Sequence, residues 1–154
     1  MRDRERPSVR RGVIACEDQD ILSRAEIERL VDVFYVRVRA DNILRPIFDD
    51  VAHVDWGRHL PKMYAFWEAI LFGSPGFKGN PLVVHRELAS RVPLGSREFG
   101  RWLRVFHESV DTLFSGPRAE EAKARASRIA TVMQQHILDG HGLEVEGHDV
   151  RRAE

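Results

Sequence analysis

The sequence predicts an all-α domain, and three observations support this fold class. Apolar residues recur at spacings of three and four, the period of a helix with one buried face. No segment shows the alternation of a convincing strand, and glycine and proline gather in short stretches between the helical segments. The chain has 154 residues, which suits one domain with a single core. Helices of similar length joined by short turns pack as such a domain.

The first helix is predicted to begin after Ser23. Ser23 and Glu26 form a capping-box pattern, in which the serine hydroxyl accepts from the glutamate N–H and the carboxylate reaches back. An apolar stripe follows at helical spacing: Ile27, Leu30, Val31, Phe34 and Val38. The helix is expected to end near Asp41-Asn42. Residues 43–48 are apolar around Pro46, so we expect a bent turn there.

The second helix is predicted to begin at Asp55. Four residues at helical spacing share one of its sides: His59, Met63, Phe66 and Ile70. Pro61 lacks a backbone donor and disfavours a helical conformation of Leu60, so we expect a distorted first turn. Loop-forming residues follow over 73–76 and 78–81, and Pro81 suits the first position of a short helix that runs to about Leu88.

Two longer helices complete the predicted domain. Ser96 is expected to cap the first of them, which carries the apolar stripe Phe99, Trp102, Leu103, Phe106, Val110, Leu113 and Phe114. Gly116-Pro117 breaks the chain and starts the second, which should end at Gly140. Its inward residues are expected to be Ile129, Val132, Met133 and Ile137. The domain should therefore occupy residues 21–140, between a flexible basic tail over 1–20 and a C-terminal tail over 141–154.

Charge and cysteine content exclude several kinds of partner and site. The 24 Lys and Arg residues balance 24 Asp and Glu residues, so no basic surplus favours nucleic acid or an anionic membrane. Cys16 is the single cysteine, which excludes an internal disulfide and a cysteine-cluster metal site and favours a reducing compartment. No stretch approaches the roughly 18 apolar residues of a membrane span, and residues 1–11 make a poor signal peptide. We therefore expect a cytoplasmic protein.

Four side chains with polar tips fall on otherwise apolar faces: Tyr35, His59, His85 and Trp102. Each of them alone is a common core residue. Together they are more informative, because two histidines on separate helices with a flat apolar space between them are what a haem requires. One imidazole binds the iron, and the other side offers hydrogen-bond donors to a gas ligand. Phenylalanines are available to line such a space: Phe48, Phe66, Phe77, Phe99 and Phe106.

Short motifs along residues 27–135 carry a family resemblance. The first are Phe34-Tyr35 and Leu44-x-Pro46-Ile47-Phe48. The longest is Trp56-x-x-His59-Leu60-x-Lys62-Met63-x-x-Phe66-Trp67. The last are Phe77-x-Gly79-x-Pro81-x-x-x-His85 and Phe99-x-x-Trp102-Leu103-x-x-Phe106. As a set they resemble the third group of truncated haemoglobins, whose fold is a shortened globin with two helices packed over two.

The resemblance implies a role for each matching position. His85 matches the proximal iron ligand, and Phe48 matches the phenylalanine that stacks on the haem. The distal positions are matched by Tyr35, His59 and Trp102, with Met63 as an apolar distal residue. Lys62 could meet a haem propionate, although Arg58 or Arg91 would serve as well. Haem b is the implied cofactor, lined also by Phe66, Phe77, Phe99 and Phe106.

The implied function is reversible binding of dioxygen and other small ligands, such as NO and CO, at haem iron. Tyr35 and Trp102 would stabilise the ligand by hydrogen bonds. Two alternatives stay open. Bound dioxygen could oxidise nitric oxide, or the haem could use peroxide, and either enzyme would need a separate reductase. The other alternative is a haem-free helical interaction module, in which the same side chains are ordinary core residues.

Overall fold

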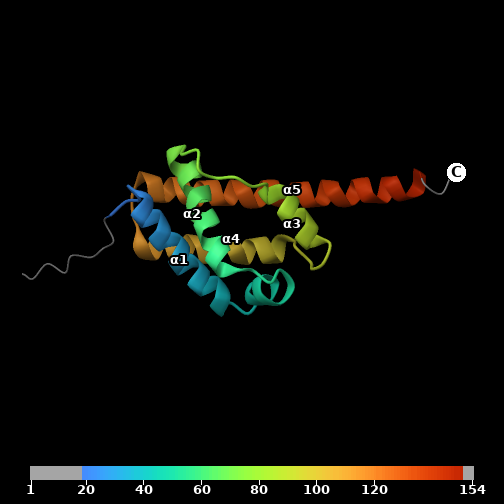
Figure 1. The fold of residues 1–154 in the computed structure, drawn as a ribbon, viewed down its shortest axis with the longest axis horizontal. Coiled ribbons are helices and arrows are strands. Elements are labelled where there is room, and N and C mark those ends of the chain that lie inside the picture. Colours follow the sequence, from blue (N-terminus) through green and yellow to red (C-terminus); the bar gives the residue numbers. More distant parts are fainter. Residues whose placement is uncertain (1–18, 151–154) are drawn as a thin grey trace, which may run out of the picture.

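The computed structural model describes the backbone of residues 19–150 and the side chains of residues 19–140 (Figure 1). Every regular element in that part of the chain is helical, so the predicted all-α class is confirmed. The elements in order are α1 (Arg24–Ala40), the short π-helix η2 (Pro46–Val51), α2 (Trp56–Phe72), α3 (Pro81–Ala89), α4 (Ser96–Leu113) and α5 (Pro117–Val150). Of the predicted tails, 1–20 and 141–154, residues 1–18 and 151–154 lie outside the described residues.

The helices form two packed pairs. In Figure 1, α4 and α5 run side by side along the long axis, and α1 and α2 cross them. α1 packs on both α2 and α4, whereas α2 also reaches α5. The short α3 lies against α5. This is the two-over-two sandwich that the family resemblance implied, and it leaves η2 and α3 at one end of the domain.

An aromatic stack forms the centre of the core. Phe106 on α4 lies between two tryptophans, with its ring centroid 4.6 Å from that of Trp67 and 5.7 Å from that of Trp102. Phe34 on α1 meets Phe106 edge-on at 5.3 Å. Each large aromatic side chain can bury roughly 150–250 Å² of surface, so this stack makes a large contribution to the core. One cluster thus joins α1, α2 and α4.

Two predicted helix caps are wrong in detail. Ser23 does precede α1, but its hydroxyl donates to the carboxylate of Glu26 and makes no capping bond to the backbone. α4 begins at Ser96, so its N-cap is Gly95, whose N–H donates to Oε2 of Glu98 at 2.9 Å. In both helices a glutamate lies in the first turn, where the positive end of the helix dipole favours it.

The segments around Pro46 and Pro61 are helical. Pro46 begins η2, so the bent turn predicted there is one wide helical turn. Pro61 lies inside α2, which continues through it. The first turn of α2 is tightened, because the carbonyl of Asp55 accepts from the N–H groups of both Arg58, at 3.1 Å, and His59, at 2.8 Å.

The last helix is longer than predicted. α5 continues past Gly140 to Val150, because Gly140 does not adopt the left-handed backbone that ends a helix. The Arg86 side chain from α3 approaches this glycine closely, since a Cβ atom at Gly140 would come within 2.4 Å of it. Val132, predicted to point inward, is 48% exposed. The inward positions on this part of α5 belong to Ala130, Met133 and Ile137, with Ile129 half-buried.

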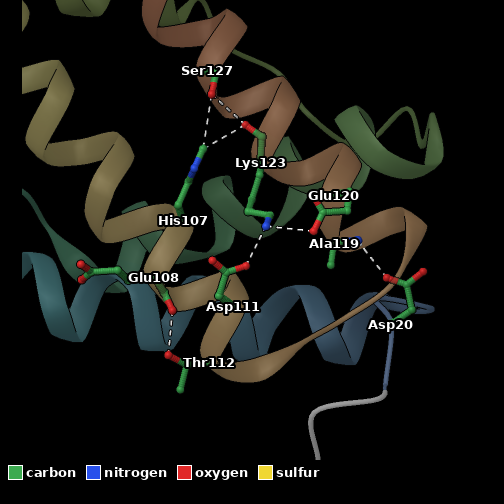
Figure 2. A network of polar contacts seen from close by, with 9 residues as sticks. All are labelled: Asp20, His107, Glu108, Asp111, Thr112, Ala119, Glu120, Lys123 and Ser127. Carbon is green, nitrogen blue, oxygen red and sulfur yellow. Dashed lines mark hydrogen bonds and ion pairs between the residues drawn. The ribbon is translucent and has the colours of Figure 1, made fainter.

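Polar contacts hold α4 against α5 on the side shown in Figure 2. Nζ of Lys123 pairs with Asp111 at 2.7 Å and with Glu120 at 2.9 Å. His107 Nε2 lies 3.1 Å from the carbonyl oxygen of Lys123 and 3.3 Å from Oγ of Ser127. All these groups have partners within the cluster, so we assign the cluster to helix packing.

Candidate functional site

A cavity of about 370 Å³ lies where the four main helices meet η2 and α3. That volume is within the range of cofactor sites. Ten of the side chains that the sequence predicted for a site line it: Tyr35, Phe48, His59, Lys62, Met63, Phe66, Phe77, His85, Phe99 and Trp102. Phe106 does not line the cavity and is fully buried behind Trp102. Its expected place in the lining is therefore wrong, and it supports the wall from behind.

His85 is fixed by the start of its own helix. Asn80 caps α3 by accepting the N–H of Val83 at 3.3 Å, and Pro81 occupies the first helical position. Nδ1 of His85 lies 2.6 Å from the carbonyl oxygen of Pro81 and donates to it. Nε2 is then left with its lone pair, which is the arrangement of a metal-binding histidine. Burial lowers the pKa of His85, and the Pro81 contact offsets only part of this.

Tyr35 and His59 form a polar pair in the same cavity. Tyr35 Oη lies 3.2 Å from Nε2 of His59, and the two ring centroids are 5.2 Å apart. Burial, with smaller contributions from the charges of His85 and Lys62, lowers the pKa of His59 to about 4. Burial raises the pKa of Tyr35. Near neutral pH this pair is therefore an uncharged imidazole beside a protonated phenol.

Trp56 supports this pair from outside the cavity, a role that the sequence analysis did not assign. Its ring lies 5.3 Å from that of Tyr35 and 5.6 Å from that of His59, and it stacks on Phe48 at 5.9 Å. Its indole N–H donates to Asp49 at 3.3 Å. Trp56 begins the longest of the sequence motifs. Its role could not be predicted, because a residue one layer behind a cavity has no distinguishing spacing.

Trp102 completes the polar set. Its ring meets Phe34 edge-on at 5.8 Å and stacks on Phe106, so the core fixes its orientation. No hydrogen bond among residues 19–140 uses its indole N–H. A buried tryptophan usually satisfies that donor. The indole of Trp102 is thus available to a molecule inside the cavity.

Charged side chains occur at the edge of the cavity. Lys62, Lys78 and Arg91 line it with the carboxylates of Glu87 and Glu98. Arg58, one of the predicted propionate partners, does not line it and pairs with Asp55 at 3.6 Å. Sequence reasoning missed Lys78, because exposed loop residues carry no periodic signal. It also missed several apolar lining residues: Val84, Leu88, Leu94 and Ala130.

Other kinds of site find no support in the described part of the chain. Residues 19–140 contain no group of three or more His, Cys, Asp or Glu side chains that could hold a metal ion by themselves. Across the described helices, no apolar stretch is long enough to cross a membrane. The chemistry on offer is therefore one histidine with a free Nε2, an apolar slot, cations at its edge and neutral hydrogen-bond donors within it.

Known proteins resemble this chain in both sequence and fold. The family model for bacterial-like globins matches residues 19–137. The group 3 truncated hemoglobin ctb of Campylobacter jejuni is 30% identical over 121 residues, which are 77% of this chain and 93% of that protein. The crystal structure of the group III truncated hemoglobin from Campylobacter jejuni aligns with a TM-score of 0.69 and 29% identity, and covers 78% of this chain and 94% of that one.

Proposed function

Because this chain belongs to the bacterial-like globin family, as a haem-binding truncated haemoglobin of group III, we propose that His85 holds haem b and that Tyr35 and Trp102 donate hydrogen bonds to dioxygen bound there. Nitric oxide and carbon monoxide would enter the same space. When bound, the haem supplies an iron with a coordination position for such a ligand.

The bond between His85 and Pro81 carries this proposal. It is 2.6 Å long and fixes the tautomer in which Nδ1 is protonated, so Nε2 is the ring atom that can bind iron. The lowered pKa of His85 also keeps Nε2 unprotonated at neutral pH. Together the two features leave the Nε2 lone pair available to a metal.

Apolar and charged parts of the cavity suit the two parts of a haem. Phe48, Phe66 and Phe99 would contact the flat porphyrin, for which an apolar slot is the usual environment. Lys62 and Lys78, at the cavity edge, would pair with the propionate carboxylates. Arg91 already donates to a backbone carbonyl, at 3.2 Å, which makes it a poorer propionate partner.

The Tyr35–His59 pair decides how well Tyr35 can stabilise a ligand. If Nε2 of His59 carries the proton, it donates to Tyr35, and the tyrosine O–H is free for the ligand. In the other tautomer His59 accepts from Tyr35 and takes that proton away. The low pKa of His59 excludes a charged imidazole at neutral pH, so the choice is between two neutral states. Ligand binding favours the first tautomer.

Two fixed donors slow ligand release, which suits ligand chemistry or sensing better than delivery. Oxidation of nitric oxide or use of peroxide would draw electrons from a separate reductase.

The globin domain would span residues 21–140, and the single cysteine favours the cytoplasm.

The test of this proposal is the rate of oxygen release from a Tyr35→Phe variant. A hydrogen bond to a charged group is worth about 1.5–3 kcal/mol, so dissociation should accelerate roughly ten- to a hundredfold. Stopped-flow spectroscopy on haem-loaded protein measures it. The chain offers a matched control in Tyr64→Phe, because Tyr64 is the other tyrosine and donates to Asp32 on the surface. An unchanged rate in Tyr35→Phe would remove Tyr35 from this role.

A further inference from the structure

Arg91 joins two opposite walls of the cavity. Its Nη1 donates to the carbonyl oxygen of Val51 at 3.2 Å. Val51 is the last residue of η2, on the wall that carries Tyr35 and His59, whereas Arg91 follows α3, which carries His85. In the part of the chain that the structure describes, no other hydrogen bond or ion pair connects residues 35–72 with residues 77–95.

The Val51 carbonyl is a favourable acceptor for a guanidinium. The last carbonyl oxygens of a helix accept no hydrogen bond from the helix itself. The negative end of the helix dipole also attracts a cation. Glu87, one turn before Arg91, lies 3.8 Å from Nη2 and orients the side chain from its own wall. About half of the Arg91 side chain is exposed, so this contact lies where the cavity meets solvent.

The segment that Arg91 holds covers part of the cavity. Ala52 and Val54, which follow Val51, are both lining residues. Between them His53 has a φ of 48°, a left-handed conformation that strains a residue with a side chain. The N–H of Val54 donates to Phe48 at 3.0 Å, and Arg91 holds the other side of the turn. Loss of the Arg91 contact would let this strained turn relax away from the cavity.

The opposite wall is also free to move once the contact is broken. No residue of α3 is fully buried, and among the described elements α3 packs chiefly on α5. A helix with little buried surface opens at low cost. The Arg91 bond therefore closes a gap between two segments that are each weakly held.

We propose that Arg91 is a latch that retains haem by tying the end of η2 to the end of α3. The proposal rests on the haem binding of the family and not on the ligand-stabilising roles of Tyr35 and Trp102. The rate of haem loss tests the latch, whereas the rate of oxygen release tests the roles of Tyr35 and Trp102. The failure of either proposal can therefore be recognised separately.

A latch differs from a propionate partner in what it bonds. If Arg91 held haem through a propionate, esterification of the propionates would abolish its effect. A bond to the Val51 carbonyl does not involve the haem, so its effect should persist. Lys62, for which we propose a propionate contact, is the matched reference for the first behaviour.

The experiment measures transfer of ferric haem to excess apomyoglobin by absorbance. Arg91→Met keeps an apolar stem of similar length and removes the donors. We expect it to lose haem about fivefold faster than the wild type, the effect of ~1 kcal/mol for one partly exposed hydrogen bond. With haem dimethyl ester, Arg91→Met should still lose its haem about fivefold faster than the wild type. Lys62→Met should lose this ester at the wild-type rate, because its propionate partner is gone.

A second measurement needs no haem. In the apoprotein, Arg91→Met should speed hydrogen exchange of the Val54 amide, and Lys62→Met should not. A wild-type rate of haem loss in Arg91→Met would overturn the latch. So would an Arg91→Met effect that disappears with the ester, because it would make Arg91 a propionate partner. Wild-type protein that takes up no haem would overturn the haem site itself.

Discussion

The imidazole of His85 shows how a helix can fix the tautomer of one of its own histidines. Pro81, four residues earlier, has no N–H, but its carbonyl accepts Nδ1–H of His85. This contact sets the tautomer and the ring direction together. Burial then lowers the pKa, so protons compete less with a metal for Nε2. The tautomer and the ring direction thus come from a residue one turn away, whereas the burial comes from the elements packed around α3.

Replacement of His85 by glycine should remove the iron ligand and leave the fold in place, since His85 is only half-buried. We expect haem affinity to fall by about tenfold or more, because even the loss of a residue behind a metal ligand costs that much. The Soret band of reconstituted protein should shift, and added imidazole should restore it. His136→Gly, on α5 and away from the cavity, controls for the glycine itself. A Soret band identical to that of the wild type would reject His85 as the ligand.

At the scale of elements, α5 is held at its start and near Gly140 by contacts from elsewhere in the chain. At its start, Asp20 accepts the N–H groups of Arg118 at 2.9 Å and Ala119 at 2.8 Å, as Figure 2 shows for Ala119. Near Gly140, the Arg86 guanidinium lies 3.5 Å from the glycine carbonyl oxygen. Contacts from distant residues therefore fix a helix on which both α3 and α4 pack.

The cap by Asp20 predicts a non-additive pair of substitutions. Gly116 has a φ of 141°, and a Cβ atom there would come within 2.6 Å of Asp20. Gly116→Ala should therefore both strain the backbone and displace the cap. Asp20→Ala alone should cost about 1–2 kcal/mol of unfolding free energy, the usual value of an N-cap. In urea titrations, the double variant should lose less than the sum of the two single losses. Simple additivity would mean that Gly116 does not act through Asp20.

The pH dependence of the Asp20 cap has a definite sign. Burial raises the pKa of Asp20, but hydrogen bonds from Arg118, Ile21 and Ala119 and the charge of Arg118 hold it below its usual 3.8. A lowered pKa in the folded state stabilises the protein above the unfolded pKa, and this stabilisation is lost as the pH falls through the folded value. The difference between wild type and Asp20→Ala should thus be full at pH 7 and shrink below about pH 4.

At the scale of the whole molecule, apolar spacing predicted where the helices lie. It predicted less well which residues of a helix reach the cavity. The stripes from Ile27 to Val38 and from Phe99 to Phe114 are real faces, so both helices were found. A stripe does not say which of its residues reach a cavity. Phe106 lies one turn beyond Trp102, which places it in the core behind the wall.

A glycine and an exposed arginine account for two further differences between the sequence-based prediction and the structure. Gly140 resembled a helix end in the sequence, but α5 continues through it and the Arg86 side chain approaches it closely. Such an approach joins residues 54 positions apart, so no local pattern records it. The Arg91–Val51 contact is equally non-local. The sequence analysis named Arg91 only as an alternative to Lys62 for a haem propionate, and it could not give the contact with Val51.

Removal of the haem should loosen one element before the others. In the haem-bound state that we propose, His85 would tie α3 to the iron, whereas in the apoprotein the main contacts of α3 are those with α5 and the Arg91 bond. α3 has no fully buried residue, whereas α4 buries Phe106 and Val110 completely. Hydrogen exchange of the apoprotein should therefore show amides of α3 exchanging at least tenfold faster than in the holoprotein, with those in the middle of α4 changing less. Equal loss of protection in α3 and α4 would show instead that haem holds the whole helical sandwich together, and that α3 is not a separately opening unit.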